Sequence, residues 1–218
     1  MSDTPTSDRT PRTTEFGELV VGFDDGVLVP RAWTTAQSYW AADLLRGSGP
    51  GPVLELCAGV GHIGLLAVAG TDRLLVLVDL DPNACEHARA NAASVRPEDA
   101  CEVRHGRVDE VLGEGERFAG VIADPPWVPS DDVHRFPDDP LTAIDGGADG
   151  MQVAWSCLEA AAAHLDDGGW LLLQLGTTAQ ADAVRGRVVS DPGLALEVAE
   201  VREYGDRGVL VHLRRTTG

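Results

Sequence analysis

The stretch from Val53 to Leu66, VLELCAGVGHIGLL, constrains the fold more than any other part of the chain. Val53 to Leu56 is a short apolar run typical of a buried strand, and Cys57 to Gly61 is a run of small residues. A helical pattern resumes from His62 to Ala69. The segment therefore predicts a strand, a tight turn and a helix. The first N–H groups of such a helix favour a ligand that carries an anion or a carboxylate.

The turn contains two glycines, Gly59 and Gly61, which let the backbone bend sharply and let a ligand approach closely. They spell G-x-G-x-x-G, and Asp79 follows at about the distance expected of a dinucleotide site. Two cofactor classes use this geometry, a nicotinamide or flavin dinucleotide and S-adenosylmethionine (SAM). Glu55, at the end of the strand, favours SAM, because a carboxylate attracts its ammonium group and repels a pyrophosphate. Cys57 is placed in the same cofactor site.

Strand-like and helix-like segments alternate after this point. Such alternation predicts a parallel sheet with helices on both faces. The expected segments are Val53 to Leu56, His62 to Ala69, Leu74 to Asp79, Asn83 to Ala93, Glu102 to His105, Phe118 to Asp124, Met151 to Leu165, Trp170 to Leu175 and Ala179 to Val189.

Both ends of the chain depart from the alternation. Leu19 to Pro30 reads as two β-rich runs around a DDG turn and predicts a hairpin, and Ala32 to Leu45 has helical composition. At the other end, Leu194 to Glu203 and Val209 to Arg214 predict an antiparallel hairpin at the sheet edge. Five parallel strands, a sixth strand and an antiparallel seventh make up the Rossmann-like layout of class I SAM-dependent methyltransferases, which is a fold-level analogy.

Composition narrows the class of protein. We expect residues 1–14, which are polar, to be a disordered leader and residues 15–218 to be one domain. The net charge of −18 argues against bulk nucleic acid as a partner. No apolar run reaches the roughly 20 residues that a membrane span needs. The four cysteines form no C-x-x-C pair, which favours a cytoplasmic protein, and the six histidines show no metal-ligand spacing.

Asp79 ends the second strand of the predicted sheet. A carboxylate at this position can accept hydrogen bonds from both hydroxyls of a ribose. Asp81, which precedes Pro82, is the better cap for the following helix. Asp79 is therefore the predicted ribose ligand, and Leu80 is placed in the same cofactor site.

Asp124-Pro125-Pro126-Trp127, at the end of the fourth strand, is the most specific signal in the chain. The two prolines fix the backbone and offer no donors, so the Asp124 carboxylate and the Pro125 carbonyl point into the cleft above the sheet. Both can accept from a nitrogen that is to be methylated, while Trp127 covers the substrate. A rigid turn with a packed tryptophan is the purely structural alternative.

These residues resemble a family. DPPW is similar to the N-P-P-Y signature of SAM-dependent N-methyltransferases, and Pro140 to Met151 resembles the segment that follows it in HemK-type protein-glutamine methyltransferases. Val27 to Arg31 with Thr34 resembles that family's V-L-I-P-R-P-E-T, and Trp170 to Gly176 resembles its fifth strand. The resemblance covers about residues 18–214, and the chain is more similar to the single-domain members. It implies SAM as cofactor, Thr34 in its site, and a Gly-Gly-Gln glutamine of a release factor or a related protein site as acceptor. It also implies a small activating partner for some members.

Three positions differ from the family pattern. Asp124 stands where the family has Asn; an ionised Asp only accepts hydrogen bonds, whereas Asn both donates and accepts. An amine would therefore suit Asp124 better than a glutamine amide. Trp33 replaces an acidic residue, and Arg107 lies where an acidic or amide side chain often faces the adenine. A protein glutamine and a small-molecule amine thus remain rival acceptors.

Two further hypotheses belong to other classes. A nicotinamide oxidoreductase shares the glycines, but the chain contains no Lys and so has no Tyr-x-x-x-Lys catalytic pair. A binding subunit without catalysis is the third hypothesis, and the intact DPPW motif argues against it.

Overall fold

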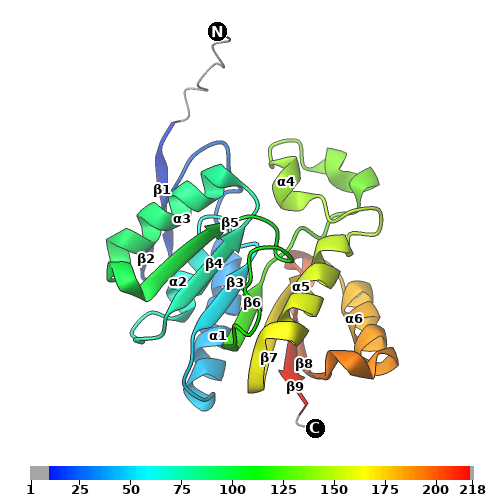
Figure 1. The fold of residues 1–218 in the computed structure, drawn as a ribbon. Coiled ribbons are helices and arrows are strands. Elements are labelled where there is room, and N and C mark those ends of the chain that lie inside the picture. Colours follow the sequence, from blue (N-terminus) through cyan, green and yellow to red (C-terminus); the bar gives the residue numbers. More distant parts are fainter. Residues whose placement is uncertain (1–9, 217–218) are drawn as a thin grey trace.

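The computed structural model describes residues 10–216. Its centre is a seven-stranded sheet with the order β5-β4-β3-β6-β7-β9-β8 (Figure 1). Strands β3 to β7 pair in parallel, while β9 is antiparallel to both β7 and β8. This confirms the predicted class I methyltransferase sheet with its antiparallel last strand. The strands are β3 (Val53–Leu56), β4 (Leu75–Asp79), β5 (Cys101–His105), β6 (Phe118–Ala123), β7 (Leu165–Leu175), β8 (Leu196–Glu203) and β9 (Val209–Arg215).

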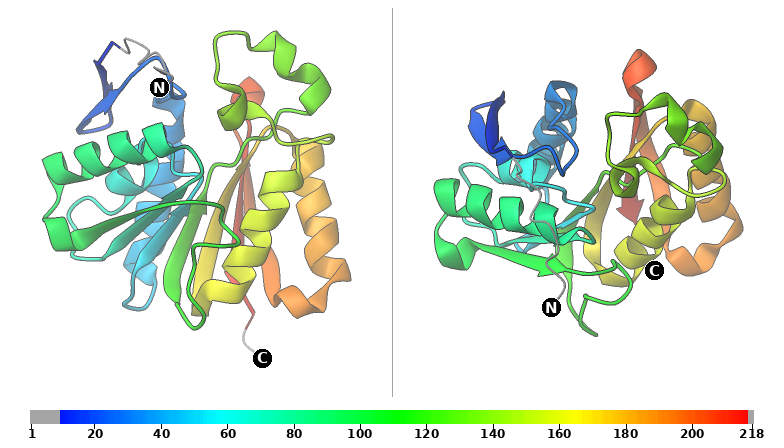
Figure 2. Two further views of the ribbon diagram at one scale, coloured as in Figure 1. Left: turned by 45° about the horizontal axis from the view of Figure 1, so that its top comes forward. Right: turned by 90° about the horizontal axis from the view of Figure 1, so that it is seen from above.

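Helices cover both faces of the sheet (Figures 1 and 2). The α-helices are α1 (Thr35–Gly47), α2 (His62–Ala67), α3 (Pro82–Val95), α4 (Leu141–Ile144), α5 (Gln152–His164) and α6 (Thr178–Ser190). The 3-10 helices are η1 (Ala32–Thr34), η2 (Glu98–Ala100), η3 (Ser130–Arg135), η4 (Pro192–Leu194) and η5 (Gly205–Arg207). One buried cluster joins the sheet to α1, α2 and α3, and a second joins it to α5 and α6.

Strand β3 shows why the central strands are apolar. Successive side chains of a strand point to opposite faces. Val53 therefore joins the cluster under α1 to α3, whereas Leu54 and Leu56 join the cluster under α5 and α6. Because both faces are covered, a polar side chain in β3 is an exception that needs a local partner. Glu55 is that exception.

The N-terminal hairpin is real, but the predicted pairing was wrong. The hairpin joins β1 (Arg12–Phe16) to β2 (Leu19–Phe23), and its turn contains Gly17 with φ +58°. The DDG sequence instead forms a turn in which Asp24 accepts hydrogen bonds from the N–H groups of Gly26 and Val27. The Asp24 side chain also accepts a hydrogen bond from Asn83 of α3. This bond turns the chain away from β2 and toward α3.

Strand β1 also starts inside the segment 1–14 that was predicted to be a disordered leader. Its first three residues, Arg12 to Thr14, pair with β2, so that boundary was wrong. Positions 1–9 of that prediction lie outside the described residues. Within residues 10–216 no helix combines the length and the apolar character that crossing a membrane requires.

Candidate functional site

Three chain segments meet at the carboxyl edge of the sheet centre. Leu56, the last residue of β3, pairs with Val78 of β4 on one side and with Ala123 of β6 on the other. The residues at or just after the carboxyl ends of β3, β4 and β6 therefore lie at the same height along the strands. They include the glycine turn, Asp79 and Asp124. The parallel pairing thus brings together the segments that the sequence marked separately.

The turn after β3 has a left-handed backbone at three positions. Cys57, Gly59 and Gly61 have φ values of +57°, +53° and +80°. A Cβ on Gly61 would lie 2.9 Å from Leu77 Cδ1, so Gly61 is needed for packing as well as for conformation. A Cβ on Gly59 would meet no atom within 4 Å. The open side of Gly59 is a place where a ligand can approach the backbone.

Two carboxylates hold this turn by accepting hydrogen bonds from backbone N–H groups. Asp79 accepts from Gly59 at 2.6 Å and from Asp81 at 2.8 Å, and Glu55 accepts from Gly64 at 2.9 Å. Burial raises the pKa of both carboxyls, and that of Glu55 is raised well above its usual range. Glu55 is 1% exposed, so it supports the turn from behind, whereas the prediction placed it in contact with the ligand.

Asp81 caps helix α3, as predicted. Its Oδ1 accepts from the Asn83 N–H at 2.9 Å, and Pro82 occupies the first turn of the helix. Asp79 is thereby left to face the glycine turn. Leu80, between the two, is 59% exposed and available to a ligand.

Arg107 and Thr34 lie in different surroundings. Arg107 follows β5, whose neighbouring residue Gly106 donates to the Asp79 carbonyl, so it belongs to the same edge of the sheet. Its exposed guanidinium pairs with Asp109 at 3.0 Å. Thr34 is 2% exposed, and its hydroxyl donates to the Arg31 carbonyl at 2.9 Å. Thr34 therefore holds the turn at η1 and offers a ligand almost no exposed surface.

Asp124 differs from the other two carboxylates because nothing in the described part of the chain donates to its oxygens. Its backbone N–H donates to the Leu56 carbonyl at 3.4 Å, which fixes the start of the loop. The side chain is partly buried, and burial raises its pKa to about 7. A carboxyl group with free hydrogen-bonding capacity therefore stands beside the glycine turn.

Trp127 is packed against the loop that follows β7. A Cβ on Gly176 would lie 2.1 Å from Trp127 Cε3, so only glycine lets the indole approach so closely. Pro125 is buried, while Pro126 and Trp127 are partly exposed. The indole thus forms a wall whose position depends on the fifth parallel strand.

Gln180 was missed by the sequence analysis. Its Oε1 accepts from the N–H groups of Gly176 and Thr177, and its Nε2 donates to the Trp127 carbonyl at 3.0 Å. It also completes a capping box with Thr177 at the start of α6. The spacing Thr-x-x-Gln was the available signal, but the predicted helix began at Ala179, after the cap.

Two further amides escaped notice because buried amides have no sequence signature of their own. Gln37 of α1 is fully buried and donates to the carbonyls of Ala123 and Leu172, which holds β6 in place just before Asp124. Asn91 of α3 donates to the carbonyls of Val60 and Gly22. It therefore connects the glycine turn to the N-terminal hairpin.

The segment that carries η3 and α4 rises beside the same edge of the sheet as the hairpin (Figure 2). Arg31 Nη2 lies 2.6 Å from Asp139 Oδ2, across 108 positions of sequence, and ties this segment to the start of α1. His134 is exposed, with Nδ1 2.8 Å from the Asp131 carbonyl oxygen. Among residues 10–216 there is no group of three or more His, Cys, Asp or Glu side chains that could hold a metal ion.

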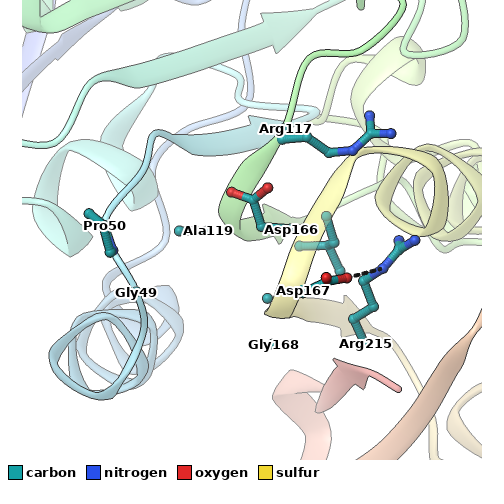
Figure 3. A pocket seen from close by; sticks show the side chains of 10 residues that line it. Gly49, Pro50, Arg117, Ala119, Asp166, Asp167, Gly168 and Arg215 are labelled. Carbon is teal, nitrogen blue, oxygen red and sulfur yellow. Dashed lines mark ion pairs between the residues drawn. The ribbon is translucent and has the colours of Figure 1, made fainter. Parts of the chain in front are cut away.

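A cavity of about 500 Å³ lies at the opposite end of the parallel strands, beside the amino ends of β6 and β7 (Figure 3). Arg117, Asp166 and Asp167 line it, and Asp167 pairs with Arg215 at 3.8 Å. None of the residues that the sequence marked as functional belongs to this cavity. The edge with the glycine turn is therefore the candidate site.

Comparison with known proteins identifies the family of this chain. The family described as "Conserved hypothetical protein 95" matches residues 39–136. A release factor glutamine methyltransferase of Yersinia pestis is 30% identical over 197 residues, which span 88% of this chain and 69% of that protein. The chain belongs to the release factor glutamine methyltransferase family. It is accordingly a methyltransferase.

Other relatives widen the family's range. A ribosomal protein uL3 glutamine methyltransferase of Bradyrhizobium diazoefficiens is 29% identical over 166 residues, which span 70% of this chain and 54% of that protein. A crystal structure of a ribosomal protein L11 methylase from Lactobacillus delbrueckii subsp. bulgaricus aligns with a TM-score of 0.63 at 12% identity, covering 88% of this chain and 83% of that one. This structural likeness supports the fold of the family alone.

Proposed function

We propose that this protein transfers a methyl group from SAM to the side-chain nitrogen of a glutamine in another protein. The observation that carries the proposal is the position of Asp124 beside the glycine turn, with its oxygens free of donors in the described part of the chain and with Trp127 of the same loop packed against Gly176. The names of the relatives support glutamine as the acceptor.

The cofactor site that we propose is the glycine turn and the end of β4. Family membership implies SAM as methyl donor, and the open side of Gly59 fits a ligand that approaches the backbone. Asp79 still has lone pairs for ribose hydroxyls after it accepts two N–H groups, because a carboxylate has about four acceptor positions. Leu80 and Arg107 would flank the adenine, and Cys57 and Gly61 would form the floor.

Glu55 and Thr34 would support the cofactor site without contacting SAM. Glu55 keeps the turn in place through Gly64, and Thr34 closes the 3-10 turn at the entrance to α1. SAM would supply a methyl group on a sulfonium centre: attack by the nitrogen would break the S–CH3 bond, S-adenosylhomocysteine would leave, and the nitrogen would release one proton to solvent. The residues of this chain then have the task of placing that nitrogen.

An amide nitrogen is a weak nucleophile, so its placement matters. The Asp124 side chain and the Pro125 carbonyl would accept its hydrogens and so direct its lone pair toward the methyl group. Trp127 would cover the amide and exclude water, in the position that Gly176 and Gln180 give it. Fixing two reactants in line can contribute about 7 to 11 kcal/mol in favourable systems.

The relatives act on release factors or on ribosomal protein uL3, so we infer that this acceptor is a protein of the translation apparatus. Such a substrate would place the chain in the cytoplasm. The small activating partner stays a prediction. One observation favours a second candidate, a small-molecule amine: Asp124 replaces the family's Asn, and an ionised carboxylate suits a donor-rich amine.

The test is a methyl-transfer assay with labelled SAM and two separate acceptors. One is the peptide-chain release factor of the source cells, and the other is a small-molecule extract of the same cells. Label on the glutamine of the release factor, located by mass spectrometry, supports the proposal. Label only in the small-molecule fraction overturns it in favour of the amine.

A further inference from the structure

A glutamine acceptor raises a chemical problem at Asp124, whose oxygens accept no hydrogen bond from the described residues. Recognition of a primary amide is two-sided, because the amide offers N–H donors and a carbonyl acceptor. An asparagine side chain can accept from the N–H groups and donate to the carbonyl, whereas an ionised aspartate can only accept from the N–H groups. The following inference rests on the proposed function and concerns the protonation state of Asp124.

The surroundings of Asp124 are rich in carboxylates. Glu55 lies on the neighbouring strand β3, and Asp79 lies at the end of β4, the next strand along. Asp124 and Asp79 are close enough to Glu55 that their charges add to the rise of its pKa. Two of the three carboxyls accept backbone N–H groups, but Asp124 accepts none from the described residues. Of the two carboxyls that keep some exposure, Asp79 and Asp124, the latter is the one whose negative charge the protein supports least.

The other groups packed around Asp124 add no positive charge. From α1 comes Gln37, a neutral amide that is already bound to the backbone of β6 and β7. From the turn comes the Cys57 thiol, whose pKa is raised, first by its contact with Cys157 and then by burial. The guanidinium groups of Arg31, Arg107 and Arg135, on the segments that follow β2, β5 and β6, are each paired with an aspartate.

We propose that Asp124 recognises the glutamine amide as a neutral carboxylic acid. Its O–H donates to the amide carbonyl oxygen, and its other oxygen accepts an amide N–H. In this form the carboxyl group has the same planar shape and the same donor and acceptor pair as the side-chain amide of asparagine. The carboxyl group thereby recognises both the N–H and the carbonyl of the amide.

The protonation state agrees with this arrangement, since burial raises the pKa of Asp124 to about 7. The neutral form is present below that pH and is lost above it. Recognition of glutamine therefore weakens as the pH rises through neutrality. An amine acceptor would show the opposite trend, because it needs the ionised carboxylate. The sulfonium of bound SAM favours the ionised form, so the fall begins at a lower pH in the SAM complex.

The experiment measures kcat/KM for the release factor at saturating SAM between pH 5.5 and 8.5. Wild-type activity should fall by up to tenfold per pH unit on the alkaline side of the Asp124 pKa. Asp124→Asn should keep methylating at pH 8.5 and should lack this alkaline fall. Asp182→Asn, a matched change of an exposed aspartate on α6, should follow the wild-type profile. Titration of SAM itself affects all three proteins alike.

Thermal unfolding gives a second readout that needs no substrate. A buried carboxyl with a raised pKa destabilises the fold as the pH rises from about 4 toward about 7. The melting temperature of Asp124→Asn relative to wild type should therefore be higher at pH 8 than at pH 5. Asp182→Asn should show no such trend.

Each outcome has a distinct meaning. If the wild-type profile rises with pH, or runs parallel to that of Asp124→Asn, Asp124 does not act as a neutral acid, although the proposed function stands. If the wild type and the Asn variant both bind SAM but methylate neither the release factor nor ribosomal protein uL3 at any pH, the proposed function fails, and this inference fails with it.

Discussion

The turn between β3 and α2 and the loop after β6 are held in place by opposite kinds of side chain. The turn is held by carboxylates, because Asp79 accepts the N–H of Gly59 in the turn and Glu55 accepts the N–H of Gly64 at the start of α2. The loop is held by neutral amides, because Gln37 donates to the Ala123 carbonyl at its start and Gln180 donates to the Trp127 carbonyl within it. Its own carboxylate, Asp124, is left without a donor from the described residues. The comparison teaches that the role of a carboxylate here depends on whether the fold already occupies its lone pairs.

The largest expected effect tests the free carboxyl group. Asp124→Ala should lower kcat/KM for methyl transfer by about 10²- to 10³-fold, since it removes a hydrogen-bonding group from the reacting nitrogen. The dissociation constant for SAM, measured by calorimetry, should change little. An equal loss of SAM binding and transfer would show that Asp124 belongs to the turn and would remove the contrast between the two regions.

Asp79 tests the other side of the comparison. Asp79→Ala should weaken SAM binding by about 10- to 100-fold, because it removes a charged acceptor from the turn and from the ribose. Asp81→Ala is the matched control. It should cost about 0.5 to 2 kcal/mol of stability through loss of the helix cap and leave SAM affinity within a fewfold of wild type. Equal affinities in the two variants would contradict the role of Asp79.

Gln180 tests how firmly the loop is held. Gln180→Ala should lower the free energy of unfolding by about 1 to 3 kcal/mol in urea titrations, because buried backbone groups lose their partner. It should also raise the KM for the acceptor, since Trp127 is released. Gln152→Ala, at an exposed position of α5, should change stability by less than about 0.5 kcal/mol. A similar small change at Gln180 would mean that the loop is held by other contacts.

The smallest expected effect concerns the link between Arg31 and Asp139. A double-mutant cycle with alanine at both positions should give a coupling energy of about 0.2 to 1 kcal/mol, because the arginine is half exposed. The coupling should fall at high salt. A coupling that is insensitive to salt would indicate that the segment with η3 and α4 is attached by packing.

The sequence predicted the sheet well because its strands are buried on both faces. Val53 to Leu56 was predicted with its observed limits, since a short apolar run ending at small residues has few other interpretations. The antiparallel end was also predicted, because no helix separates the last two β-rich runs. The cap at Asp81 followed from the proline next to it.

The pairing of the N-terminal hairpin and the roles of the supporting amides could not be predicted from a local sequence pattern. The DDG sequence reads as a hairpin turn, but Asp24 is drawn to Asn83 and His87 of α3, which are far away in sequence. Gln37 and Asn91 have partners that only the tertiary fold brings near. Glu55 was predicted to contact the cofactor, and its burial against Gly64 of α2 could not be known before the path of that helix was known.

The three side-chain hydrogen bonds of Asn91 couple the N-terminal hairpin to the glycine turn. A two-stranded ribbon is marginally stable by itself, and β1 and β2 are anchored through Gly22 to the same side chain that holds the Val60 carbonyl. The ribbon and the turn should therefore open as one cooperative unit. A ligand that orders the turn will slow amide exchange in strands that it never touches.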